Sequence, residues 1–226
     1  MKSTLSFILS VSMMLLVAGC ANQGEKKSGE EDQTPTAEEQ KELETIAMKQ
    51  MQHLPDEPVF DIETKLGTIR VRLYADTPKH RDNFSKLALK GFYNGVLFHR
   101  VIPNFMIQTG DPLTKKAENE AQFGTGGPGY QIEAEIVPTH HHKKGALAAA
   151  RKSNIANPLK ESSGSQFYIV QSEEGCRHLD GEYTIFGETI SGFEVIDAIA
   201  ALPTNARGLP NNPVKIKSIK LVSELQ

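Results

Sequence analysis

The most informative stretch of this 226-residue sequence is Phe98-His99-Arg100-Val101-Ile102-Pro103-Asn104-Phe105-Met106-Ile107-Gln108. Side chains of an extended strand alternate between two faces, so Met106 and Gln108 fall on one face. A turn at Pro103-Asn104 would bring Arg100 back beside them. The stretch therefore predicts a charged fork next to an apolar surface. That combination suits a peptide ligand with a carbonyl to hold and a ring to bury.

Two strands and a helix are predicted ahead of this stretch. Residues 59–64 and 68–74 form the strands, and the second alternates Ile69, Val71 and Leu73 with two arginines, as a half-buried strand does. In the helix that follows, Thr77 is a candidate N-cap, Pro78 fits the first turn and Gly91 fits the end.

Further strands are expected at residues 145–150, 166–170, 183–189 and 214–222, the last with a bulge near Ser218. A second helix is predicted to begin at Ser191, where Ser191-Gly192-Phe193-Glu194 resembles a capping box. Residues 124–129 are rich in glycine, but no Lys-Ser/Thr pair follows, so we expect a surface loop and not a phosphate site. Many short strands with two helices predict a mainly β fold, a closed barrel capped by helices.

Two more stretches share a family with the first. Gly164-Ser165-Gln166-Phe167-Tyr168-Ile169-Val170 and Leu179-Asp180-Gly181-Glu182-Tyr183-Thr184-Ile185-Phe186-Gly187 follow it in order. Together they resemble the cyclophilin-type peptidyl-prolyl isomerases, from about residue 59 to residue 222. The resemblance implies an eight-stranded antiparallel β-barrel with a helix over each end, and isomerase activity on X-Pro bonds.

The resemblance also implies the site. Arg100 matches the family's catalytic arginine, and Gln108 matches the glutamine that steadies it. Rotation about an amide breaks no bond, so no metal and no cofactor is expected. The residues expected to bind substrate are Phe105, Met106, Ala150, Arg151, Gln166, Tyr168, His178, Leu179 and Tyr183.

Four positions depart from the usual family pattern. Tyr168 replaces a phenylalanine, and its hydroxyl needs a polar partner or water. Tyr183 stands where many members have histidine, and His178 where some eukaryotic members have tryptophan, which puts strong cyclosporin binding in doubt. Thr109 replaces a common glycine; a β-branched residue tolerates positive φ poorly, so the backbone there is expected to differ.

The N-terminal segment resembles that of a bacterial lipoprotein. Lys2 precedes an apolar run over residues 5–17, too short for a permanent membrane helix and typical of a signal peptide. The run ends at Cys20 in a sequence like a lipobox, so residues 1–20 are expected to be a signal and Cys20 the lipidation site. An ordinary secretory signal with an incidental cysteine is the alternative. The expected location is the bacterial cell envelope, anchored to a membrane through lipid on Cys20, with the domain facing the periplasm or the surface.

The remainder divides into three parts by composition. Residues 21–36 contain almost nothing apolar and are expected to be a flexible tether. Thr36 begins a second capping-box pattern, and helical spacing follows within residues 37–55, which either pack on the domain or stand clear of it. Residues 56–226 are long enough for one domain with a sizeable core.

Charge and cysteine content exclude several function classes. The formal net charge is -3 and the isoelectric point is near 6.2, so no nucleic-acid partner is expected. Cys176 is the only cysteine beyond Cys20, which makes a disulfide within the domain impossible. The run His140-His141-His142 lies beside two lysines and is expected to be a solvated loop, not a metal site.

The partners expected are X-Pro segments of unfolded or partly folded exported proteins, met by a monomer. Two other functions stay open at this stage. The same slot could belong to a module that only binds proline-containing peptides, or the fold could serve as a surface scaffold. Arg100 and Gln108 favour the enzyme, since a binding module needs only the apolar slot.

Overall fold

The computed structural model of the chain describes residues 37–222. The α-helices are α1 (Ala37–Gln52), α2 (Pro78–Leu89) and α3 (Phe193–Ala200), and three short 3-10 helices are η1 (Pro112–Lys115), η2 (Ala117–Gln122) and η3 (Arg177–Leu179). The strands are β1 (Val59–Thr64), β2 (Gly67–Leu73), β3 (Arg100–Ile102), β4 (Met106–Thr109), β5 (Gln131–Ile132), β6 (Ala146–Ala149), β7 (Ser162–Ser163), β8 (Phe167–Val170), β9 (Ile185–Ser191) and β10 (Ile216–Leu221).

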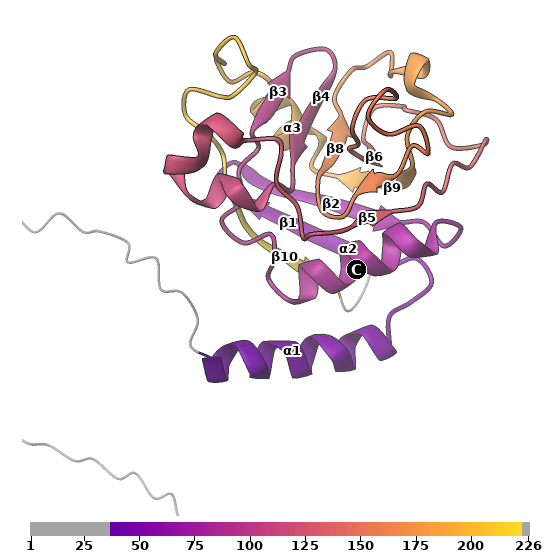
Figure 1. Cartoon of the computed structure of the whole chain (residues 1–226), viewed down its shortest axis with the longest axis vertical. Helices are drawn as coiled ribbons and strands as arrows, with labels where there is room; N and C mark the ends of the chain where they lie inside the picture. Colours follow the sequence, from indigo (N-terminus) through magenta and orange to yellow (C-terminus); the bar gives the residue numbers. More distant parts are fainter. Residues whose placement is uncertain (1–36, 223–226) are drawn as a thin grey trace, which may run out of the picture. The chain divides into compact units, whose positions relative to one another are not determined.

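One curled antiparallel sheet of eight strands dominates the domain (Figure 1), in the order β10-β1-β2-β9-β6-β8-β4-β3. Its edge strands β3 and β10 do not form a ladder with each other. Instead the segment ahead of β3 bonds to the start of β10 and to the residues just before it: Gly95 N–H donates to Ile216 O at 2.8 Å, and Phe98 N–H donates to Val214 O at 2.9 Å. The predicted barrel is therefore present, with closure confined to this short bridge.

The first two strands have the predicted positions to within one residue. Ile69 and Val71 point into the interior and are fully buried. On the other face, Arg70 donates to Asp61 at 2.7 Å. The register between β1 and β10 shifts between Ser218 and Ile216, so the irregularity predicted near Ser218 is present.

The sheet carries apolar residues on both faces where β4, β6 and β8 lie side by side. In β8, Phe167 and Ile169 belong to the interior core, whereas Tyr168 and Val170 belong to a second apolar cluster. From β6 and the residue after it, the second cluster receives only small side chains, Ala146, Ala148 and Ala150. Small residues at these positions leave room above the sheet for a pocket.

Two predicted helix starts are wrong in detail. The Thr77 side chain makes no capping hydrogen bond to α2, although Pro78 does open the helix. Helix α3 begins at Phe193, because Ser191 still pairs with Arg70 in the sheet and Gly192 turns the chain at φ 86°. A Cβ on Gly192 would lie 2.2 Å from Thr68 O, so this turn requires glycine and leaves no capping box.

Helix α1 packs against α2, which answers a question that the sequence leaves open. Ala47 is buried, and Lys90 Nζ lies 2.9 Å from Glu44 Oε1. The capping box predicted at Thr36 and the lipidation site predicted at Cys20 lie outside the described residues.

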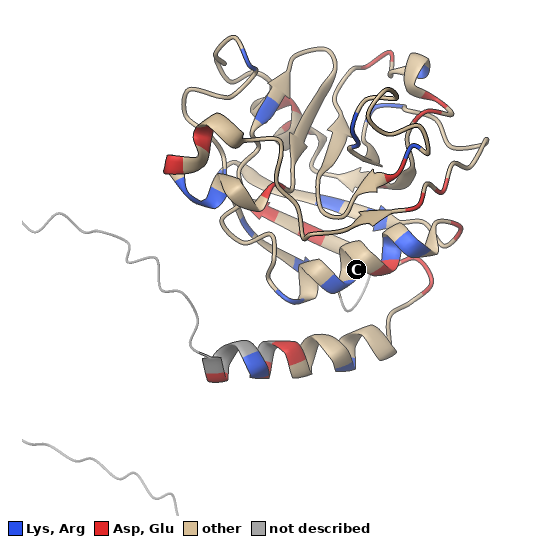
Figure 2. Ribbon diagram, in the orientation of Figure 1, with Lys and Arg blue, Asp and Glu red and all other residues tan. Residues whose placement is uncertain are grey.

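Acidic and basic residues are intermingled along the ribbon (Figure 2). Pairs of opposite charge bridge neighbouring strands on the outer face, such as Lys220 with Glu63 at 3.0 Å. Within residues 37–222, no helix is both long enough and apolar enough to cross a membrane.

Candidate active site

The hairpin of β3 and β4 places Arg100 directly opposite Gln108. The chain reverses at Pro103-Asn104 as predicted, with Asn104 at φ 58° and the Phe105 N–H donating to Ile102 O at 3.1 Å. Arg100 Nη1 lies 3.3 Å from Gln108 Oε1 and 3.9 Å from the Met106 sulfur. The guanidinium is therefore held beside an apolar surface, which is the arrangement that the strand alternation predicts.

Arg100 is half-buried, and burial lowers the pKa of its guanidinium below its ordinary value. Among residues 37–222, no carboxylate forms a salt bridge with it. An arginine keeps its charge at any physiological pH. Its N–H groups are therefore available to a ligand and are not committed to a structural ion pair.

A pocket on the outer face of the sheet opens beside this guanidinium. Its walls come from β4, β8, the end of β6, η3 and the segment before β9. The pocket gathers nine of the residues predicted to act on substrate: Arg100, Phe105, Met106, Gln108, Ala150, Arg151, Tyr168, Leu179 and Tyr183.

The two other predicted residues lie next to this pocket and do not line it. The His178 ring lies beside Phe105, which lines the pocket, with 6.1 Å between the two ring centroids. Gln166 stands behind Gln108: its Oε1 accepts from Gln108 Nε2 at 3.0 Å. Its own Nε2 donates to Gly124 O at 3.0 Å and to Gly126 O at 2.8 Å.

Gln166 also borders an adjacent hollow lined by the glycine-rich loop. Residues 124–127 and 129 of the loop line this hollow together with Arg151 and Lys152. Asp111 fixes the loop, because its buried carboxylate accepts from Gly124 N–H at 2.6 Å and from Gly126 N–H at 3.1 Å. A run of side-chain contacts thus leads from the loop through Gln166 and Gln108 to Arg100.

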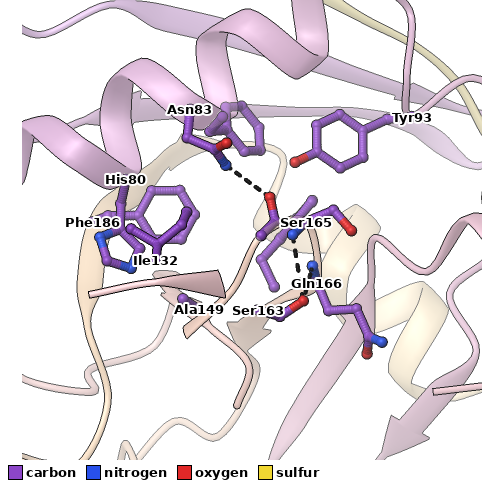
Figure 3. Close-up of a pocket in the computed structure, with 12 residues that line it drawn as sticks. His80, Asn83, Tyr93, Ile132, Ala149, Ser163, Ser165, Gln166 and Phe186 are labelled. Atoms are coloured by element: carbon purple, nitrogen blue, oxygen red, sulfur yellow. Dashed lines mark hydrogen bonds between the residues drawn. The ribbon is translucent and has the colours of Figure 1, made fainter. Parts of the chain in front are cut away.

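A third pocket lies on the opposite side of the Gln166 segment, under α2 (Figure 3). There Asn83 Nδ2 donates to Gly164 O at 2.8 Å, and Ser163 Oγ accepts from Gln166 N–H at 3.0 Å. The first bond holds the segment before β8 against the helix, and the second fixes the turn within that segment. Its lining contains no arginine, so we treat it as a structural support of the site.

The backbone next to Gln108 shows how Thr109 is accommodated. Thr109 stays in the β4 ladder, fully buried, and its hydroxyl donates to Leu97 O at 2.8 Å. The left-handed conformation falls one residue later, on Gly110 at φ 91°. A Cβ there would lie 2.1 Å from Ser165 O, so Gly110 supplies the conformation that Thr109 cannot adopt.

The histidine run at residues 140–142 corrects the expectation that it forms a solvated loop. His141 is exposed, but the His142 side chain is completely buried and its Nε2 lies 2.9 Å from the Tyr168 hydroxyl. Sequence reasoning missed His142 and its partner Asp180. The one signal for them is Tyr168 itself, whose hydroxyl requires a partner in an otherwise apolar place.

Comparisons with known proteins place this geometry in a family. The family model "Cyclophilin type peptidyl-prolyl cis-trans isomerase/CLD" matches residues 59–221. A peptidyl-prolyl cis-trans isomerase-like 1 protein of Aspergillus fumigatus is 40% identical over 74% of this chain and 95% of that protein. A peptidyl-prolyl cis-trans isomerase of Acinetobacter baylyi is 36% identical over 73% of this chain and 86% of that protein. The crystal structure of a cyclophilin type isomerase of Cryptosporidium parvum matches with a TM-score of 0.65 and 31% identity, over 75% of this chain and 99% of that one.

The comparisons contradict the predicted location. The relatives are mostly eukaryotic isomerase-like proteins, from several Aspergillus species, fission yeast and chicken, and are not bacterial lipoproteins. The prediction of a lipid-anchored protein of the bacterial envelope is therefore wrong. It was drawn from residues 1–20, which lie outside both the described residues and the matched region.

Proposed function

This chain belongs to the cyclophilin-type peptidyl-prolyl cis-trans isomerases, and on that premise we propose that Arg100 catalyses the rotation while the adjacent pocket holds the proline ring. The isomerase activity is that of the family. The proposal concerns which residues of this chain produce it and on what substrates.

The chemistry requires charge stabilisation and no bond cleavage. Resonance gives the X-Pro amide a rotation barrier of about 18–20 kcal/mol. As the amide twists, the prolyl nitrogen regains its lone pair and becomes a hydrogen-bond acceptor. A donor aimed at that nitrogen binds the twisted state more tightly than either planar state, which is what lowers the barrier.

The observation that carries the proposal is the state of Arg100. Its guanidinium lines the pocket, is steadied by Gln108 at 3.3 Å, and has no carboxylate partner in the described part of the chain. A donor fixed before the substrate arrives needs little reorganisation during the reaction. Gln108 in turn donates to Gln166, and this hydrogen bond fixes the side chain that orients Arg100.

The other residues that line the pocket favour a proline ring as its occupant. Phe105 and Leu179 offer apolar surface next to buried Met106, and Tyr168 and Tyr183 pack edge to face at 5.8 Å. Burying such a ring excludes water from the amide and strengthens the hydrogen bond from Arg100.

Substrates of the proposed reaction are X-Pro segments of unfolded or partly folded polypeptides. A related Cryptosporidium parvum isomerase structure was determined in the presence of the dipeptide Ala-Pro, and at 32% identity it supports a proline-containing peptide as ligand here. The prediction that the clients are exported proteins depended on the location that the comparisons contradict, so we assign no compartment to them.

The test is the cis-trans relaxation rate of an Ala-Pro peptide with the full chain and with Arg100→Ala. Removing one preorganised transition-state donor lowers the rate about a hundred- to a thousandfold, so we expect kcat/KM to fall by that factor. Arg100→Lys should restore little, because an ammonium lacks the planar fork. Arg70→Ala is the matched control, since Arg70 pairs with Asp61 on the outer face of the barrel. A folded Arg100→Ala variant with near-normal turnover would show that another feature of the pocket lowers the barrier.

A further inference from the structure

Three side chains form a continuous hydrogen-bonded row behind the proline pocket. Asp180 Oδ1 lies 2.8 Å from His142 Nδ1, and His142 Nε2 lies 2.9 Å from the Tyr168 hydroxyl. Tyr168 lines the pocket, whereas His142 does not and is completely buried. Of the three side chains, only Tyr168 lines the pocket, so only its ring can contact a substrate there.

Hydrogen-bond accounting fixes the direction of every proton in the row. Burial raises the pKa of Asp180, but the bonds it accepts from the His142 N–H, the His142 ring and the His141 ring outweigh burial and bring its pKa to about 2. An ionised Asp180 accepts only, so Nδ1 of His142 carries the proton. Burial lowers the pKa of His142 and keeps the ring neutral, which leaves Nε2 as an acceptor. The Tyr168 hydroxyl is then the donor.

We propose that Asp180 and His142 are positioning residues for the proline pocket, holding the Tyr168 hydroxyl away from the substrate so that its ring presents an apolar surface to the prolyl ring. The proposal rests on the proposed function, because it assigns the pocket to proline. It explains how a tyrosine serves where the family usually has phenylalanine.

Without such a partner, the hydroxyl would be left unpaired in an apolar place. It would then draw a water molecule into the slot, or the ring would turn toward solvent. Either change removes surface that contacts the prolyl ring in the planar and the twisted amide alike. Losses of that kind weaken substrate binding and leave the chemical step almost unchanged.

The row is not a proton relay for the reaction. Rotation about the amide transfers no proton, and burial raises the pKa of Tyr168 well above its ordinary value, so the hydroxyl stays protonated. The groups around the row are consistent with a static role. The Tyr183 ring packs at right angles to the His142 ring and to the Tyr168 ring. The Cys176 N–H donates to His142 O at 2.7 Å.

The experiment compares His142→Leu, Tyr168→Phe and the double variant with the full native chain. His142→Leu leaves the hydroxyl unpaired, so KM for an Ala-Pro peptide should rise about tenfold, equivalent to about 1.4 kcal/mol, with kcat within about twofold. Tyr168→Phe alone removes the hydroxyl that needs the partner but leaves Nε2 of His142 without its donor, so KM should rise by less than in His142→Leu. The double variant should have a lower KM than His142→Leu, because its pocket wall is apolar without the row.

The dissociation constant of the same peptide, measured by NMR titration, separates this proposal from the proposed function. If Arg100 were not the catalyst, the turnover of Arg100→Ala would contradict the proposed function. The titration would still report whether the peptide binds in the pocket. A double variant as weak as His142→Leu would overturn the positioning role, as would a His142→Leu defect confined to kcat. The nitrogen-15 spectrum of His142 in the native chain tests the row without any mutation: we expect Nδ1 protonated and Nε2 not. The opposite tautomer, or two protonated nitrogens at neutral pH, would overturn the proposal.

Discussion

The guanidinium of Arg151 lies 4.5 Å from the centroid of the Tyr183 ring, so one wall of the pocket beside Arg100 is a cation stacked on an aromatic face. Arg151 is anchored in turn by Glu182, whose backbone oxygen accepts from Nε at 2.7 Å and whose carboxylate lies 3.0 Å from Nη2. The sequence predicts Arg151 and Tyr183 at the site as residues that bind substrate. The structure adds a role for the Arg151 side chain, as the support of Tyr183.

Loss of this support should weaken binding of the peptide. Stacking of a guanidinium on a ring contributes about 0.5–1 kcal/mol, so Arg151→Ala should raise KM about two- to fivefold with little change in kcat. Arg151→Lys should recover only part of the loss, since an ammonium cannot stack as a plane. Steady-state kinetics on an Ala-Pro peptide measure both constants, and Arg70→Ala again provides the control. A drop in kcat with unchanged KM would assign Arg151 to the chemical step instead.

Local sequence patterns predict the hairpin of β3 and β4 because all the determinants lie within eleven residues. The alternation of Met106 and Gln108 and the turn at Pro103-Asn104 need no information from elsewhere in the chain. The same holds for β1 and β2, whose apolar alternation is regular.

Long-range constraints account for what the sequence does not reveal. Ser191 looks like a helix cap, yet pairing with Arg70 keeps it in a strand. His142 looks like part of a solvated loop, yet Asp180, far along the chain, satisfies its ring and allows its burial. In both places the deciding partner is distant in sequence, and only the folded chain brings it near.

Gln108 should matter for the chemical step more than for binding. Its Oε1 orients Arg100, and its Nε2 is fixed by Gln166 at 3.0 Å, so Gln108→Ala leaves the guanidinium free to move. Small displacements of a catalytic group are costly, and we expect kcat to fall about ten- to a hundredfold. Gln122→Ala, an exposed glutamine in η2, controls for the substitution itself. Unchanged kcat in a folded Gln108→Ala variant would mean that Arg100 is oriented by the substrate alone.

Acid should destabilise the fold in two steps through the Asp180–His142 pair. The pKa of His142 is lowered by burial, so below about pH 6.5 the unfolded chain binds a proton that the folded chain does not, and stability falls as the pH drops. The pKa of Asp180 is about 2 in the folded chain against an ordinary 3.8, so its stabilisation is present above about pH 4 and is lost as the pH falls through 2.

Thermal unfolding between pH 7 and pH 5 measures the first of these steps. The fall in Tm over this range should be smaller in the His142→Leu/Tyr168→Phe double variant than in the native chain. Burial also lowers the pKa of His99, so part of the fall should remain in both proteins. Equal slopes for the two proteins would show that His142 titrates alike in the folded and unfolded states.

Asp111 should be the residue through which the glycine-rich loop acts on both stability and turnover. Its carboxylate is fully buried and accepts three backbone N–H groups, from Leu113 at 2.8 Å and from Gly124 and Gly126. In Asp111→Asn one oxygen becomes an NH₂ group, which faces an N–H donor whichever way the amide is turned. Hydrogen bonds to a charged acceptor contribute about 1.5–3 kcal/mol, so we expect the free energy of unfolding to fall by about 2–3 kcal/mol.

Because the loop carbonyls hold Gln166, and Gln166 holds Gln108, the same substitution should also lower kcat for an Ala-Pro peptide. Asp61→Asn is the matched control: it weakens a half-exposed pair with Arg70 and should cost less than about 1 kcal/mol with normal turnover. Denaturant unfolding and steady-state kinetics on both variants separate the two effects. If Asp111→Asn lost stability but kept full kcat, the loop would support the fold without orienting Arg100, and the contacts through Gln166 would carry no catalytic influence.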